Sequence, residues 1–192
     1  MDVDAPIFNK IRARDQIRAS KNIDDRNQMI EKCLDRDPNS RIFRLERARA
    51  YVELDKLDLA RRDLDLVTDI AESDPEGFFI RGYVQYKLGN DELALLDLSN
   101  AIKLGVQRAD CFYLRSHLYF SSGKIEKAID DLEECIDREA TNWHARELLV
   151  RCLDKIGRKS QAKIELDSLL RGNPEGAARV LLDHDMLTLH QG

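Results

Sequence analysis

One spacing recurs through most of this chain and limits what it can fold into: similar residues return every 34 positions. An alanine recurs four times, a leucine follows each alanine by four residues, and a residue suited to a sharp turn precedes it by five. The positions are Asp55, Gly89, Gly123 and Gly157 for the turn, then Ala60, Ala94, Ala128 and Ala162, then Leu64, Leu98, Leu132 and Leu166. Four copies at one period indicate an array of helical repeats.

Each copy is predicted to hold two amphipathic helices. In residues 75–105, apolar side chains recur at helical spacing on both sides of Gly89-Asn90. Neither helix alone can bury its apolar stripe, and the hairpin of the two still leaves one flank open for a neighbouring copy. A residue in the middle of the first helix allows the two helices to approach closely. It is Ala48, Gly82, Ser116 and Val150 in the four copies.

This pattern resembles the tetratricopeptide repeat family. The segments FIRGYVQYKLGNDELALLDLSNAIKLG and FYLRSHLYFSSGKIEKAIDDLEECI contain the aromatic residue, small residue, turn glycine, alanine and closing Ala-Ile of the family pattern. The chain departs from the pattern at Asp55, which replaces the turn glycine, and at Arg44 and Arg146, which replace the opening aromatic residue. The resemblance implies an all-α fold, a right-handed superhelical solenoid of antiparallel helix pairs.

The domain organisation follows from the repeats. Residues 1–40 are expected to be a degenerate helical unit that caps the array, with helices over 7–20 and 22–36. Residues 41–176 are four 34-residue repeats, and 177–192 hold a capping helix, to Leu189, and a tail. Helix pairs are predicted at 41–54 and 57–72, 75–88 and 91–104, 109–122 and 125–138, and 143–156 and 159–171. In the last helix, Arg179, Asp183 and Asp185 are predicted to face outward.

The charges repeat with the same period. An arginine precedes the small residue of the first helix in three repeats, and an acidic residue lies sixteen positions later. Because the two positions face each other across an antiparallel hairpin, three ion pairs are predicted. They are Arg47–Asp63, Arg81–Asp97 and Arg115–Asp131. In the fourth repeat Leu149 replaces the arginine, so Glu165 is expected to be unpaired.

The resemblance also implies that the first helix of each pair lines a concave inner face. Aromatic side chains gather at the inward positions and basic residues flank them, which suits a groove for an extended or helical peptide. Tyr86 and Phe120 are the rings most apt to complete the hairpin packing instead. His144 and Glu147 occupy inward positions of the fourth repeat. The predicted partner-binding residues are Arg49, Phe79, Tyr83, Tyr86, Lys87, Tyr113, His117, Phe120 and Arg151.

Other chemistry has few residues to support it. The four cysteines show no CxxC spacing, the histidines form no HxxxH pair, and no nucleotide-binding or nucleophile motif occurs, so neither an enzyme, a metal site nor a cofactor is predicted. A net charge of −5 argues against nucleic-acid binding. The absence of an 18-residue apolar run argues against a membrane span. The acidic first residues lack the pattern of a signal peptide, so a cytoplasmic location is expected.

The sequence therefore favours a non-catalytic adaptor or scaffold that binds a protein or peptide partner in a concave groove. Two alternatives stay open. The chain could be a structural subunit that self-associates through its terminal helices, so its oligomeric state is not fixed. It could also be a co-chaperone with a non-standard groove, because the Lys and Asn clamp of tetratricopeptide domains that grip chaperone C-termini is missing.

Overall fold

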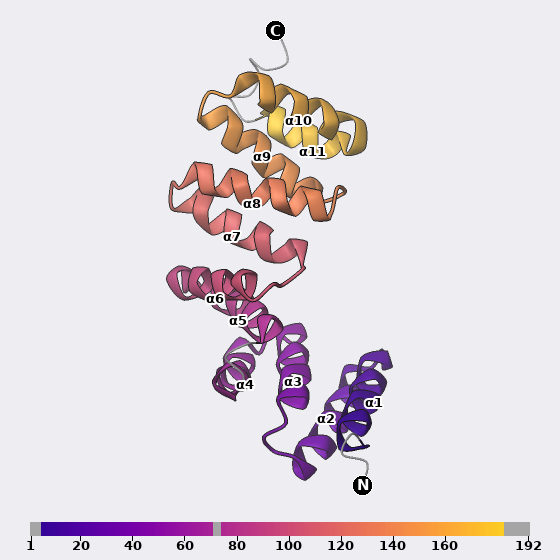
Figure 1. Cartoon of the computed structure of the whole chain (residues 1–192). Coiled ribbons are helices and arrows are strands. Elements are labelled where there is room, and N and C mark those ends of the chain that lie inside the picture. Colours follow the sequence, from indigo (N-terminus) through magenta and orange to yellow (C-terminus); the bar gives the residue numbers. More distant parts are fainter. Residues whose placement is uncertain (1–4, 71–73, 183–192) are drawn as a thin grey trace. The chain divides into compact units, whose positions relative to one another are not determined.

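A computed structural model describes residues 5–70 and 74–182, and these residues form helices and no strand (Figure 1). The chain divides into two compact units, Met1–Gly105 and Val106–Gly192. The first unit contains α1 (Ala5–Ala19), α2 (Ile23–Arg36), α3 (Arg41–Glu53), α4 (Leu57–Ile70), α5 (Pro75–Lys87) and α6 (Asp91–Lys103). The second contains α7 (Ala109–Ser121), α8 (Ile125–Arg138), α9 (Trp143–Lys155), α10 (Lys159–Gly172) and α11 (Pro174–Leu182).

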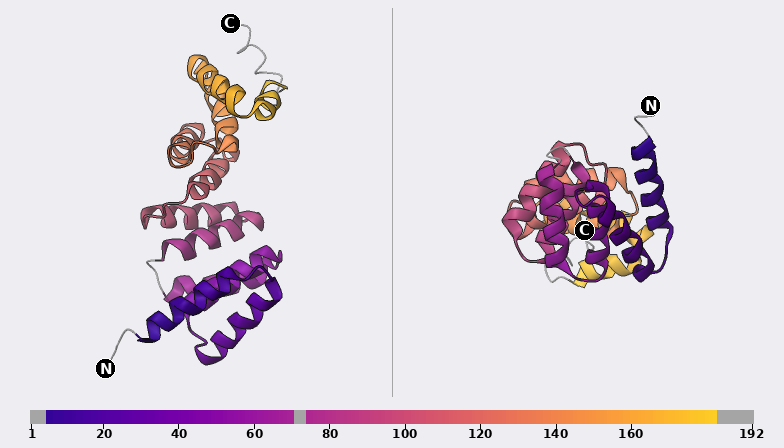
Figure 2. Two further views of the ribbon diagram at one scale, coloured as in Figure 1. Left: turned by 90° about the vertical axis from the view of Figure 1, so that its right-hand side faces the viewer. Right: turned by 90° about the horizontal axis from the view of Figure 1, so that it is seen from below.

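Within each unit, consecutive helices form antiparallel pairs. In the first unit α3 pairs with α4 and α5 with α6, and α4 also packs against α5. In the second unit α7 pairs with α8 and α9 with α10, while α8 packs against α9 (Figure 2). The all-α fold of antiparallel helix pairs predicted from the sequence is confirmed.

The hairpins turn at the residues that the 34-residue spacing identified. The backbone φ angle is 76° at Gly89 and Gly123, 77° at Gly157 and 55° at Asp55. These left-handed conformations favour glycine, and aspartate is one of the few other residues that tolerates them. The next amide then donates back into the helix, as Asn90 N does to the Gln85 carbonyl at 2.9 Å, which closes a Schellman turn. Asp55 therefore makes the turn that glycine makes in the other repeats.

The last helix begins earlier than predicted. α11 starts at Pro174, three residues before the expected Ala177. Proline suits the first helical position because its missing N–H would have no helical partner there. Asn173 supports this start, since its side-chain Oδ1 accepts from Gly176 N at 3.2 Å and its carbonyl from Ala177 N at 3.0 Å. The remainder of the predicted helix, residues 183–189, lies outside the described residues.

The periodic apolar positions form the core of each unit. The four alanines and four leucines of the 34-residue spacing are at most 1% exposed. Burying each leucine stabilises the fold by about 1.5–3 kcal/mol. Gly82 shows why a small residue is needed on the first helix: a Cβ there would lie 2.9 Å from the Leu98 Cγ. The stripe read from the sequence is thus the surface that the helix pairs bury.

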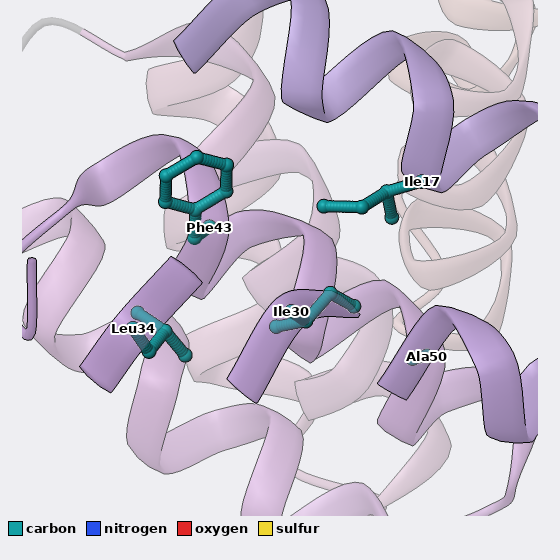
Figure 3. Close-up of a cluster of buried hydrophobic side chains, with 5 residues drawn as sticks. All are labelled: Ile17, Ile30, Leu34, Phe43 and Ala50. Atoms are coloured by element: carbon teal, nitrogen blue, oxygen red, sulfur yellow. The ribbon is translucent and has the colours of Figure 1, made fainter. Parts of the chain in front are cut away.

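The first two helices cover α3 with a hydrophobic cluster. Ile17 of α1 and Ile30 of α2 are 2% and 1% exposed. They pack with Leu34 of α2 and with Phe43 and Ala50 of α3 (Figure 3). Residues before the repeats therefore share a core with the first repeat.

The three predicted ion pairs are present. In each pair the arginine Nε and one Nη atom lie 2.7–2.8 Å from the two carboxylate oxygens, and the aspartate side chain is 4–7% exposed. Two of the arginines also reach the preceding helix pair: Arg47 Nη1 donates to Glu31 at 3.2 Å and Arg81 Nη1 to Thr68 Oγ1 at 2.6 Å. Such paired, buried charges fix the register of the helices.

The prediction that Glu165 has no partner is wrong. Arg146 of α9 donates to its carboxylate. Arg146 lies three residues, or about one helical turn, before Leu149, so its long side chain reaches the same acidic group. Arg44 has the equivalent position in the first repeat, where its Nη1 donates to Asp63 at 3.1 Å. The arginines that replace the opening aromatic residue thus have a structural role.

Candidate functional site

The predicted partner-binding residues all lie on first helices of the pairs, divided between the two units. In the first unit, Arg49 lies on α3, and Phe79, Tyr83, Tyr86 and Lys87 lie on α5. In the second unit, Tyr113, His117 and Phe120 lie on α7, and Arg151 lies on α9.

The second unit brings three of these residues to one pocket of about 200 Å³. Tyr113 and His117 are four residues apart, so they extend from the same face of α7. Residues at helical spacing on α9 form the opposite wall. The pocket is lined by Tyr113, His117, His144, Glu147, Leu148 and Arg151. One aromatic ring, two imidazoles and two charged groups thus surround a space that suits a single side chain.

The acidic group of this pocket is held by α11. Arg179 Nη2 donates to Glu147 Oε1 at 2.7 Å, and Arg179 Nε to Oε2 at 3.4 Å. This hydrogen bond raises the pKa of Arg179. The Glu147 side chain is only 13% exposed, and His144 Nδ1 lies 3.9 Å from its Oε1. The sequence predicted that Arg179 faces outward, but its side chain, 50% exposed, reaches across to α9. Asp183 and Asp185 lie outside the described residues.

Phe120 does not line this pocket. Its ring is half-buried, and the Lys155 Nζ lies 5.2 Å from the ring centroid. A lysine at this distance from a ring makes a favourable cation–π contact. Phe120 therefore packs within the α7–α9 region of the unit.

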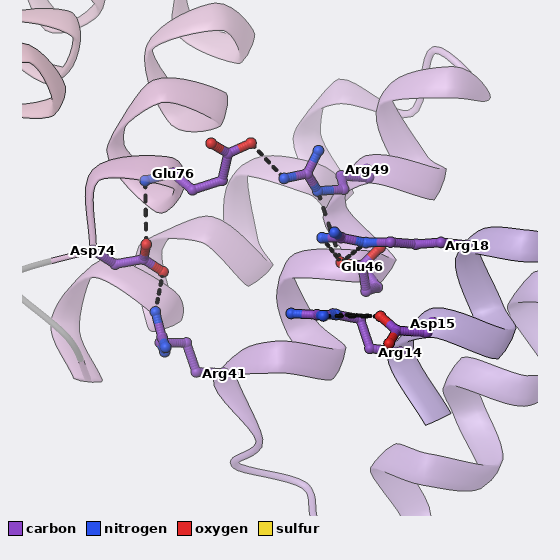
Figure 4. A network of polar contacts seen from close by, with 8 residues as sticks. All are labelled: Arg14, Asp15, Arg18, Arg41, Glu46, Arg49, Asp74 and Glu76. Carbon is purple, nitrogen blue, oxygen red and sulfur yellow. Dashed lines mark hydrogen bonds and ion pairs between the residues drawn. The ribbon is translucent and has the colours of Figure 1, made fainter. Parts of the chain in front are cut away.

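In the first unit, Arg49 belongs to a network of charges (Figure 4). Its Nη2 donates to Glu76 at the start of α5, and its Nε lies 3.9 Å from Glu46 Oε1. Arg18 of α1 donates to the same Glu46 oxygen. These contacts connect α1, α3 and α5.

A cavity of about 260 Å³ lies beside this network, among α1, α2 and α3. It is lined by Ile17, Arg18, Arg26, Ile30, Glu46, Arg49, Ala50 and Glu53. Its charges pair with one another: the bond to Glu46 raises the pKa of Arg18, and the bond from Arg26 lowers the pKa of Glu53.

Sequence reasoning missed Arg18 and Arg26. One signal could have found them, since an acidic residue follows each of these arginines by 27 or 28 positions, as Glu76 follows Arg49. That distance spans from one helix pair to the next. In each case the arginine and its acidic partner lie on helices of consecutive helix pairs.

The predicted residues of α5 differ in exposure. Phe79 is 6% exposed and belongs to the core, whereas the sequence favoured Tyr86 and Phe120 as packing residues. Tyr83 and Tyr86 are half-buried and Lys87 is exposed. The accessible part of this face consists of two tyrosines and a lysine.

The described residues contain no group of three or more His, Cys, Asp or Glu side chains that could hold a metal ion. The four cysteines, all within the described part of the chain, form no disulfide with one another. Burial raises the pKa of Cys111, Cys135 and Cys152 to about 12, so they are poor nucleophiles. The helices in the described part of the chain are too short or too polar to cross a membrane.

Comparison with known proteins agrees with this geometry. A family model described as tetratricopeptide repeat matches residues 119–182. The crystal structure of MamA is similar, with 22% identity over 86% of this chain and 96% of that chain and a TM-score of 0.73. No curated protein shows significant sequence similarity to this chain.

Two further solved structures resemble the chain. YrrB, described as a TPR protein with an unusual peptide-binding site, has 15% identity over 84% of this chain and 89% of that chain, with a TM-score of 0.74. The first TPR of Spaghetti (RPAP3), bound to the HSP90 peptide SRMEEVD, has 21% identity over 60% of this chain and 92% of that chain, with a TM-score of 0.57.

The helix pairs, their left-handed turns and their 34-residue period define an α-helical repeat protein. The resemblance to the tetratricopeptide repeat family is confirmed by the family match and by the fold of these similar structures.

Proposed function

We propose that this chain is a non-catalytic adaptor that binds a segment of a partner protein on the first helices of its repeats. The observation that carries the proposal is the pocket of the second unit, where Tyr113, His117 and Arg151 converge from two helices. A tyrosine beside polar and charged groups offers a large contact area and directional hydrogen bonds to a peptide. Two of the similar structures are described by their peptide binding, which supports the same role here.

On the first unit, the proposed contacts are Tyr83, Tyr86 and Lys87 of α5. Arg49 and Phe79 contribute indirectly, because Arg49 connects α3 to α5 and Phe79 is buried. We place the protein in the cytoplasm, where a reducing environment suits four cysteines that form no disulfide with one another. The net charge of −5 favours protein partners over nucleic acid.

Selection of a random-peptide display library on the intact chain tests the proposal. We expect enriched peptides whose affinity falls about tenfold or more in Tyr113→Ala, as for a buried aromatic contact at an interface. Tyr119→Ala is the matched control, since Tyr119 lies on the same helix but stacks against Arg115 and Lys127. Its affinity should change less than about threefold. The proposal fails if no peptide is enriched, or if Tyr113→Ala binds the enriched peptides as tightly as the unmodified chain.

Assembly through the terminal helices and a co-chaperone role with a non-standard groove stay predictions. Sedimentation equilibrium of the intact chain tests the first of them. A concentration-dependent mass that is lost when residues 174–192 are deleted would favour a structural subunit.

A further inference from the structure

The cavity among α1, α2 and α3 has polar walls in which every arginine already has a carboxylate partner. The three ion pairs are Arg18–Glu46, Arg26–Glu53 and Arg49–Glu76. We propose that this cavity is a subsite for a carboxamide side chain, Gln or Asn, of the partner segment. The inference deepens the proposed function and rests on it for the source of the side chain.

The ion pairs make the cavity a poor site for a charged group. A carboxylate or an ammonium that entered it would lose hydration and would find no uncompensated charge of opposite sign. The Glu46 side chain is only 5% exposed, and its Oε1 lies between the guanidinium of Arg18 and the Nε of Arg49, 3.9 Å away (Figure 4). The cavity therefore favours a neutral ligand.

The same network leaves both a hydrogen-bond acceptor and donors for such a ligand. Arg18 Nε and Nη2 both donate to Glu46 Oε1, and within the described residues no hydrogen bond reaches Glu46 Oε2. Among those residues, Nη1 of Arg18 and Nη1 of Arg49 likewise donate no hydrogen bond. A carboxamide complements both, because its NH2 group donates and its carbonyl oxygen accepts.

The apolar walls and the size of the cavity suit the rest of such a side chain. Ile17 of α1, Ile30 of α2 and Ala50 of α3 line it, and each is at most 2% exposed (Figure 3). These groups can pack against the methylene groups of the ligand. A volume of about 260 Å³ lies below the range of pockets that enclose a drug-sized molecule, so it matches one side chain.

Model compounds test the inference without a partner protein. The N-acetyl N-methylamides of Gln, Glu, Lys and norleucine are titrated at neutral pH into the intact chain with isotope-labelled isoleucine methyl groups. We expect the NMR signals of Ile17 and Ile30 to shift saturably with the Gln compound, with a dissociation constant of about 1 mM for a ligand of this size. The other compounds should bind about tenfold more weakly, because Glu and Lys lose hydration and norleucine leaves the polar atoms unpaired.

Glu46→Gln should reverse the preference between the Gln and Glu compounds. A guanidinium only donates, so the amide oxygen of the new side chain faces Arg18 and an NH2 group replaces Oε2. The variant also leaves Arg18 without its counter-charge. The Glu compound should then bind about threefold or more tightly than the Gln compound.

Glu31→Gln is the matched control. Glu31 lies on α2 and accepts from Arg47 Nη1 at 3.2 Å, but it does not line the cavity. This variant should keep the order of affinities of the unmodified chain. Circular dichroism reports whether both variants are folded.

The inference is overturned if the Gln compound does not shift the Ile17 and Ile30 signals, or if another compound binds the unmodified chain as tightly. An unchanged order in folded Glu46→Gln would also overturn it. If that variant does not fold, the order on the unmodified chain decides. None of these results concerns the second-unit pocket, so the peptide selection with Tyr113→Ala tests the adaptor function separately.

Discussion

Replacing Arg81 by methionine should destabilise the chain by about 3 kcal/mol, because it leaves Asp97 as a buried charge without its partner. Arg81 Nε and Nη2 each lie 2.8 Å from an Asp97 oxygen, and the Asp97 side chain is 4% exposed. Methionine keeps much of the aliphatic stem of Arg81 and removes the guanidinium, whose Cζ lies 5.5 Å from the centroid of the Phe78 ring.

The magnitude follows from burial. Breaking a buried ion pair by removing one partner costs about 3–5 kcal/mol, and the lower end applies because the Arg81 side chain is 19% exposed and water can reach part of the site. Adding Asp97→Asn removes the stranded charge. The double variant should therefore be more stable than Arg81→Met alone, by about 1–2 kcal/mol.

Urea unfolding followed by helical circular dichroism measures the free energy of unfolding, and hydrogen exchange of the α5 and α6 amides measures it locally. Arg61→Met is the matched control in the same unit. Its guanidinium lies 3.4 Å from Asp58, and the two side chains are 42% and 74% exposed. Loss of such a surface pair should cost less than about 0.5 kcal/mol.

Two results would refute this reasoning. Arg81→Met could lower the free energy of unfolding by no more than Arg61→Met does. In that case the Arg81–Asp97 ion pair contributes no more than a solvent-exposed pair. Alternatively, the double variant could lose the sum of the two single losses, in which case the two side chains are not energetically coupled.

The remaining predictions concern turns, thiols and pH. Asp55 and Gly123 both have positive φ. Asp55→Gly should therefore stabilise the chain by up to about 1 kcal/mol, and Gly123→Ala should destabilise it by about 1 kcal/mol. Thermal unfolding midpoints equal to that of the unmodified chain would contradict this. Maleimide at pH 8 should label Cys33 well before the other three cysteines, because burial raises their pKa to about 12. Mass spectrometry that shows uniform labelling of all four would contradict this. Because Arg26 lowers the pKa of Glu53, this group stabilises the fold above its unfolded pKa and the contribution is lost as pH falls through the lower folded pKa. Glu53→Gln should reduce that acid-side loss in a pH series of urea midpoints.

The 34-residue period in the sequence was sufficient to predict the helix pairs, the turns and the three repeated ion pairs. All of these depend on residues of one hairpin, where helical spacing and a short turn determine which side chains meet. Most first and second helices begin at the predicted residue for the same reason. α11 differs because Asn173 and Pro174 start a helix before the repeat position.

The inward positions implied by the family resemblance included Tyr113, His117 and Arg151, which the structure brings to one pocket. The same positions included His144 and Glu147, which also line the pocket, but the sequence could not identify Arg179 as the partner of Glu147. Glu147 and Arg179 belong to helices of different repeat positions, and whether two long side chains meet depends on how closely those helices pack. The partner of Glu147, like the Arg146 that pairs with Glu165, was therefore decided by tertiary packing.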